Sequence, residues 1–120
     1  MFDWHRFLDL ARQLESNSLD EAVLRTAINR AYYAAYHRAS RYVRDALLVE
    51  PTTGLTHDLV WRVLARSPDD RHRNIAERGF AMKAERTRSD YQAWYRADLA
   101  DAARKAIDVS EAIIRSIDAL

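Results

Sequence analysis

Scarcity of glycine and proline is the feature that most constrains the fold of this chain. Only two of its 120 residues are glycine and two are proline, and none of the four occurs before position 51. The tight turns of all-β and βαβ folds depend on these residue types, whereas long helices do not. Hydrophobic residues make up 48% of the chain, which excludes a disordered class. The sequence therefore predicts an all-α protein.

Five helices are expected from the spacing of apolar residues and from the breaks between them. They cover residues 2–15, 19–48, 56–65, 70–87 and 95–120, which gives a five-helix up-and-down bundle in one domain over residues 1–120. Ser18 followed by Glu21 matches a capping box for the second helix, and Ser67–Asp69 caps the fourth. Residues 50–54 form a loop, and residues 89–91 end the fourth helix. Gly79 is expected to be tolerated inside that helix at a cost of about 1 kcal/mol.

The longest predicted helix, 19–48, carries a core stripe counted at 3.6 residues per turn. The stripe consists of Leu24, Ile28, Ala31, Ala35, Ala39, Tyr42 and Ala46. In the first helix the inward positions are expected to be Phe7, Leu10, Ala11 and Leu14. The three tryptophans are expected to be core or interface anchors.

Charge and residue types exclude several classes of function. Nineteen Lys and Arg against 18 Asp and Glu give a net charge of +1, so any charge-based function must be local. The absence of cysteine excludes disulfides and thiolate metal sites, and the four histidines lack ligand spacing, so we expect no metal and no cofactor. No apolar run approaches about 18 residues, which predicts a soluble, cytoplasmic protein without a membrane partner.

Three motifs carry a family resemblance. Residues 25–37 read RTAINRAYYAAYH, residues 54–57 read GLTH, and residues 88–91 read RSDY. The first segment resembles the R-A-Y-Y-A-A-[FY]-H signature of the HEPN (higher eukaryote and prokaryote nucleotide-binding) superfamily, and the other two are similar to weaker motifs of that superfamily. The likeness spans most of the chain and includes the order of helices, so it implies a HEPN-type bundle.

A polar stripe runs along the same helix, away from the core stripe. Arg30 and His37 are seven residues apart and lie about 20° from each other around the helix. Tyr33, Arg41 and Arg44 fall within about 60° of the same line. Arginine matches phosphate oxygens, histidine titrates near neutral pH and tyrosine can stack on a base. These residues could therefore grip a phosphate group.

The resemblance implies a chemistry for the stripe. Many HEPN proteins carry an R-x(4-6)-H motif linked to metal-independent RNA cleavage, and Arg30 with His37 fits it. By that likeness His37 would move the ribose 2′-OH or leaving-group proton, and Arg30 would stabilise the phosphorane. Two departures are Ala31 directly after Arg30 and the placement of the motif on the second helix. Arg66 and His72, with five residues between them, also fit R-x(4-6)-H, but across a predicted helix break.

Other interpretations of these residues stay open. Arg41 and Arg44 fit an ordinary solvated face, and His37 could satisfy a buried hydrogen bond. His57 is expected near a helix start, and residues 71–73 are expected to form a solvated first turn. Asp90 is expected to cap the last helix or to pair with Arg86 or Arg88.

We consider three classes of function for this chain, the third of which does not involve nucleic acid. The first is a metal-independent ribonuclease, for example a toxin of a toxin–antitoxin pair, with catalytic Arg30 and His37 and with Tyr33, Arg41 and Arg44 binding substrate. The second is a non-catalytic module that binds RNA, a nucleotide or a partner protein such as a small nucleotidyltransferase. The third is a purely structural helical adaptor.

A homodimer is also expected. Tyr33, Tyr36, Trp94 and Tyr95 lie outside or at the edge of the core stripe, as interface anchors often do. Symmetric dimers are the commonest oligomers, and the two-fold axis is expected near the second or the last helix.

Overall fold

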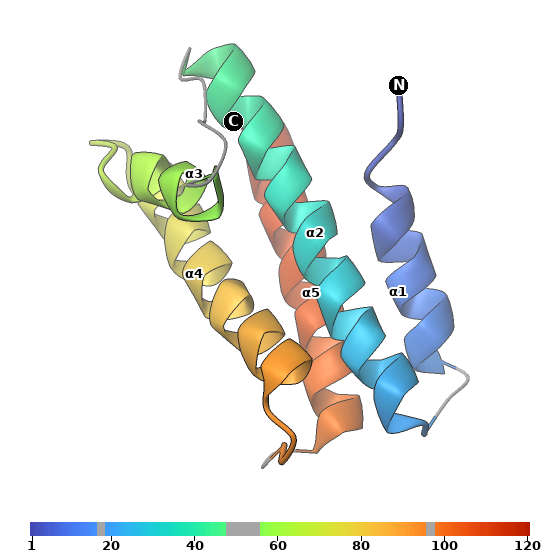
Figure 1. Ribbon diagram of the computed structural model, residues 1–120. Coiled ribbons are helices and arrows are strands. Elements are labelled where there is room, and N and C mark those ends of the chain that lie inside the picture. Colours follow the sequence, from blue (N-terminus) through green and yellow to red (C-terminus); the bar gives the residue numbers. More distant parts are fainter. Residues whose placement is uncertain (17–18, 48–55, 96–97) are drawn as a thin grey trace.

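The computed structural model describes residues 1–16, 19–47, 56–95 and 98–120, without the side chains of residues 56 and 57. Its helices are α1 (Arg6–Ser16), α2 (Glu21–Ala46), α3 (Thr56–Ala65), α4 (Asp70–Tyr91) and α5 (Leu99–Asp118). The prediction of an all-α, five-helix bundle is confirmed for these ranges. The four longer helices alternate in direction, and α3 lies across one end of α4 (Figure 1).

Helix α2 is the centre of the bundle, because it contacts each of the other four helices. The expected core stripe is confirmed over most of its length, whereas Tyr42 is half-buried and Ala46 is exposed. Small side chains on α2 let its neighbours approach closely. The fully or nearly fully buried alanines are Ala27, Ala31, Ala34, Ala35 and Ala39.

A second buried face of α2 carries aromatic rings. Tyr32 and Tyr36 pack against Trp61 of α3, with ring centroids 6.3 and 6.4 Å from the indole. The Trp61 Nε1–H donates to the Tyr32 hydroxyl at 3.0 Å, and burial raises the pKa of Tyr32 above its usual range. Tyr36, expected outside or at the edge of the core stripe as an interface anchor, is instead buried, because α3 packs over this side of α2.

Helix boundaries follow the capping aspartates. Asp20 caps α2 by accepting from the backbone N–H groups of residues 22 and 23, so the predicted cap at Ser18, itself outside the described residues, is wrong. Asp69 caps α4 as predicted. Asp98 caps α5, which therefore begins at Leu99 and not at residue 95. The predicted loop at 50–54 and the side chain of His57 lie outside the described residues.

Two further boundaries differ from the sequence prediction. Helix α4 continues through residues 89–91, because Ser89 is buried and its hydroxyl donates to the Arg86 carbonyl inside the helix. Helix α1 begins at Arg6 instead of Phe2. In α1 the buried residues are Leu8 and Ala11, and Leu10, predicted to face inward, is exposed.

Candidate functional site

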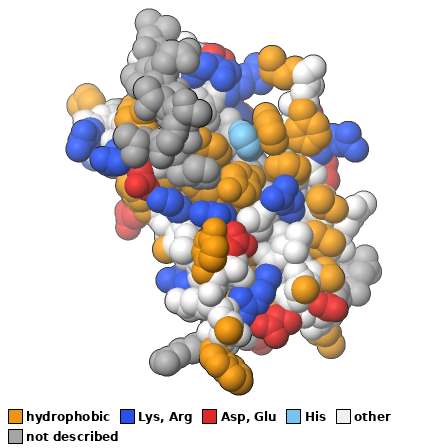
Figure 2. Space-filling view, viewed as in Figure 1, with side chains coloured by type: hydrophobic (Ala, Val, Ile, Leu, Met, Phe, Trp, Pro, Cys, Tyr) orange, Lys and Arg blue, Asp and Glu red, His pale blue; other side chains and the backbone are white. Residues whose placement is uncertain are grey.

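A cavity of about 220 Å³ lies between the start of the chain and the second half of α2. Residues 1–5 form one wall, and the other consists of Ala34, His37, Arg38, Ser40, Arg41 and Arg44 of α2 with Ile114 of α5. We call this the N-terminal cavity. Figure 2 shows basic and hydrophobic side chains near a histidine on the upper part of the molecule. Three of the five predicted site residues, His37, Arg41 and Arg44, line it.

An aromatic cluster from residues 2–7 covers His37. The Trp4 indole stacks on the His37 imidazole with ring centroids 3.6 Å apart and an angle of 13° between the planes. Phe2 and Phe7 lie 4.9 and 5.3 Å from Trp4, edge-on. His37 is therefore half-buried.

The arginines of the cavity are only partly neutralised. Arg38 pairs with Asp118 of α5 at 3.0 Å. Arg41 and Arg44 share one carboxylate, Asp45, at 3.6 and 3.1 Å, and their side chains are 68% and 47% exposed. Exposed ion pairs contribute about 0–1 kcal/mol, so an incoming phosphate could take over these guanidinium groups at little cost.

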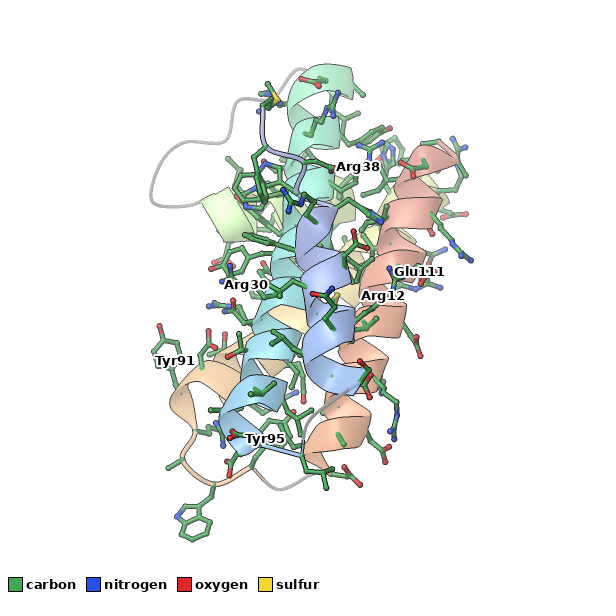
Figure 3. All side chains as sticks on the ribbon, turned by 90° about the vertical axis from the view of Figure 1, so that its right-hand side faces the viewer. Arg12, Arg30, Arg38, Tyr91, Tyr95 and Glu111 are labelled. Atoms are coloured by element: carbon green, nitrogen blue, oxygen red, sulfur yellow. The ribbon has the colours of Figure 1, made fainter. Side chains whose placement is uncertain are left out.

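Arg30 lies outside the N-terminal cavity. Its Nε donates to the Asn29 side-chain oxygen at 2.9 Å, and its guanidinium carbon lies 4.5 Å above the Phe7 ring. Asn29 in turn donates to Asp90 of α4 at 3.1 Å, and Asp90 also accepts from Arg86. Figure 3 shows Arg30 and Arg38 at different heights along α2. The pairing of Asp90 with Arg86 confirms one of the alternatives given for it.

Tyr33 lies between the two motif residues. Its ring centroid is 5.5 Å from the Arg30 guanidinium and 6.1 Å from the His37 ring. Arg86 of α4 also lies 5.8 Å from this ring. Tyr33 does not line the N-terminal cavity, so the structure divides the five predicted residues into a cavity group and an Arg30–Tyr33 group.

His72 is buried, and the prediction that residues 71–73 form a solvated turn is wrong for it. Its Nε2 lies 2.8 Å from the Tyr42 hydroxyl and its Nδ1 lies 2.7 Å from the Ser67 hydroxyl. The Ser67 oxygen also accepts from the Asp69 N–H at 3.1 Å. The Nε2 contact thus joins α4 to α2, and the Nδ1 contact joins α4 to the connection that precedes it, which assigns His72 a structural role.

The tryptophans divide between the core and the surface. Trp61 is fully buried, whereas Trp94 is 87% exposed. Trp4 was missed as a site residue, although three aromatic residues within positions 2–7 were a signal for it. Asn29, which orients Arg30, carries no sequence signal of this role.

Neither a metal centre nor a membrane span is found among the described residues. No group of three or more His, Asp or Glu side chains there is arranged so that it could hold a metal ion, and no described helix is long and apolar enough to cross a bilayer. Comparisons with models of protein families, with curated proteins and with solved structures find no match for this chain.

Proposed function

We propose that this protein binds RNA, and that the N-terminal cavity receives a phosphate group of the strand. The observation that carries the proposal is the lining of the cavity, which combines Arg38, Arg41, Arg44 and two histidines with one carboxylate, Asp3. The arginines also pair with Asp118 and Asp45, which do not line the cavity. Arginine forks match phosphate oxygens, and phosphate contacts supply most of the affinity for nucleic acid. The resemblance of residues 25–37 to the HEPN signature supports RNA as the anion.

Binding to a labelled single-stranded RNA at low salt, followed by fluorescence anisotropy, tests the proposal. Arg41→Ala/Arg44→Ala is expected to weaken binding at least about tenfold, because two charged donors worth about 1.5 kcal/mol or more each are lost, less their ion pairs to Asp45. The control is Arg62→Ala/Arg104→Ala, which removes the same charge at two exposed, ion-paired positions outside the cavity. Equal losses in the two double variants would overturn the proposal.

Ribonuclease activity is a second candidate, favoured by His37 lining the cavity beside Arg41 and Arg44. There His37 could exchange a proton with the ribose 2′-OH while the arginines hold the phosphate. Arg30 would have to leave Asn29 and Phe7, or act from a second chain. Incubation with RNA in the presence of a chelator decides: cleavage that is lost in His37→Ala supports catalysis, and cleavage undiminished in His37→Ala, or no cleavage at all, leaves binding alone.

We also propose a homodimer, but the aromatic residues at its interface differ from those expected from the sequence. Tyr91 and Trp94 are 79% and 87% exposed near the end of α4, whereas Tyr36 is buried and Tyr33 and Tyr95 are half-buried. Figure 3 shows Tyr91 projecting from the left side of the bundle, below its middle. Light scattering is expected to give the mass of two chains for the parent protein and of one chain for Trp94→Asp, and a parent mass of one chain would contradict the dimer.

A further inference from the structure

We propose that Phe2 and Trp4 form a stacking platform for one unpaired base of the bound strand, so that the N-terminal cavity selects single-stranded RNA. This inference rests on the proposed function. It gives the base of the nucleotide a binding surface, whereas the arginines bind only the phosphate. Both residues line the cavity, and both are partly exposed, Phe2 by 46% and Trp4 by 38%.

The two rings are held in place on the protein side. Trp4 is fixed by its stack on His37 at 3.6 Å, and Phe2 meets Trp4 edge-on at 4.9 Å. The turn that presents them is closed by the His5 N–H, which donates to the Asp3 carboxylate at 3.0 Å. A ring that is already ordered loses little entropy when a base stacks on it.

The platform and the arginines lie at the spacing that a nucleotide needs. His37, under Trp4, precedes Arg41 by four residues, which is about 6 Å along the helix axis. A base against Phe2 and Trp4 would therefore have its phosphate near Arg41 and Arg44.

Base stacking predicts a preference that phosphate contacts alone do not produce. Every base has a π-face, so the platform tolerates different sequences, but it requires that the base be unpaired. A duplex, whose bases are stacked on each other, offers only phosphates to the cavity. An abasic sugar–phosphate strand offers the same charge with nothing to stack.

The experiment compares three labelled ligands of equal length at fixed salt: single-stranded oligoadenylate, an abasic strand and a duplex. For the parent protein we expect the base-containing strand to bind about fivefold to a hundredfold more tightly than the abasic strand. In Phe2→Ala/Trp4→Ala this ratio is expected to fall to about one while the affinity for the abasic strand stays within about twofold. Trp4→Phe should restore part of the ratio, and Phe80→Ala, which replaces an exposed aromatic residue that does not line the cavity, should leave it unchanged.

Each other outcome has a defined meaning. A ratio of one in the parent protein, with binding that still depends on Arg41 and Arg44, overturns the platform and leaves the proposed function standing. Loss of abasic-strand affinity in Phe2→Ala/Trp4→Ala also overturns it, because the rings would then act only by shaping the cavity. No binding of any of the three ligands overturns the proposed function itself.

Discussion

Because Gly79 of helix α4 has no side chain, the indole of Trp61 fills the space beside it. A Cβ atom at this position would lie 2.3 Å from the nearest ring atom of Trp61. The ring cannot easily retreat, since Trp61 is fully buried and its N–H is held by the Tyr32 hydroxyl. Gly79 is thus required by packing, which corrects the expectation that it is merely tolerated.

Gly79→Ala is therefore expected to lower the free energy of unfolding by up to about 2 kcal/mol. Overpacking costs about 1–3 kcal/mol, and the better helix propensity of alanine returns only about 1 kcal/mol. Urea denaturation followed by circular dichroism measures the difference. Ala84→Gly, at an exposed position of the same helix, serves as the control for propensity alone. A Gly79→Ala variant more stable than the parent would contradict the packing account.

At the scale of elements, Arg25 of α2 holds the end of α4. Its guanidinium donates to the carbonyls of Ser89 at 2.8 Å and Gln92 at 2.6 Å, and its side chain is 17% exposed. These carbonyls belong to the last turn of α4 and the connection after it, where a helix lacks internal donors. Arg25 therefore extends α4 through residues that, in the sequence, are typical of a break.

Arg25→Met keeps the apolar stem and removes the donors, so it is expected to lower the free energy of unfolding by about 1.5–3 kcal/mol. Arg104→Met is the matched control, because Arg104 is 57% exposed and its ion pairs lie on the surface. Thermal and urea unfolding measure both. A loss for Arg25→Met no larger than that of the control would show that these bonds do not stabilise the end of α4.

The N-cap of α4 predicts a pH dependence. Hydrogen bonds from the Arg71 side chain, and then from its backbone N–H, lower the pKa of Asp69 from its usual 3.8 to about 2. A lowered folded-state pKa means that the stabilisation is complete above the unfolded pKa and is lost as the pH falls toward the folded one. A hydrogen bond from the Arg12 side chain likewise lowers the pKa of Glu111.

Stability is therefore expected to fall as the pH drops from about 4 to about 2, and less steeply in Asp69→Asn, which keeps a capping oxygen without the titration. Unfolding curves measured between pH 2 and pH 7 check this. The parent should be more stable than Asp69→Asn at pH 7 and equal to it near pH 2. Parallel curves over the whole range would contradict the role of Asp69.

At the scale of the whole molecule, helix number and order were predictable from the sequence, and the site was predictable only in part. Apolar spacing on α2 and the few glycine and proline positions were sufficient for the bundle. They could not show that residues 2–5 precede α1 and cover His37, because the stack of Trp4 on His37 joins segments far apart in the sequence. Helical angles place Arg30 and His37 on one face of α2. In the structure, however, Arg30 contacts Phe7 and Asn29, whereas His37 stacks on Trp4.

The salt dependence of RNA affinity tests the central claim most directly, because it counts the phosphates that the protein neutralises. For single strands the logarithm of affinity falls with the logarithm of salt concentration by about 0.7 per phosphate contact. If Arg41 and Arg44 together hold one phosphate in the N-terminal cavity, the slope for Arg41→Ala/Arg44→Ala should be smaller than that of the parent by about 0.7. The slope for Arg62→Ala/Arg104→Ala should match the parent. A slope unchanged in the cavity variant would contradict the account.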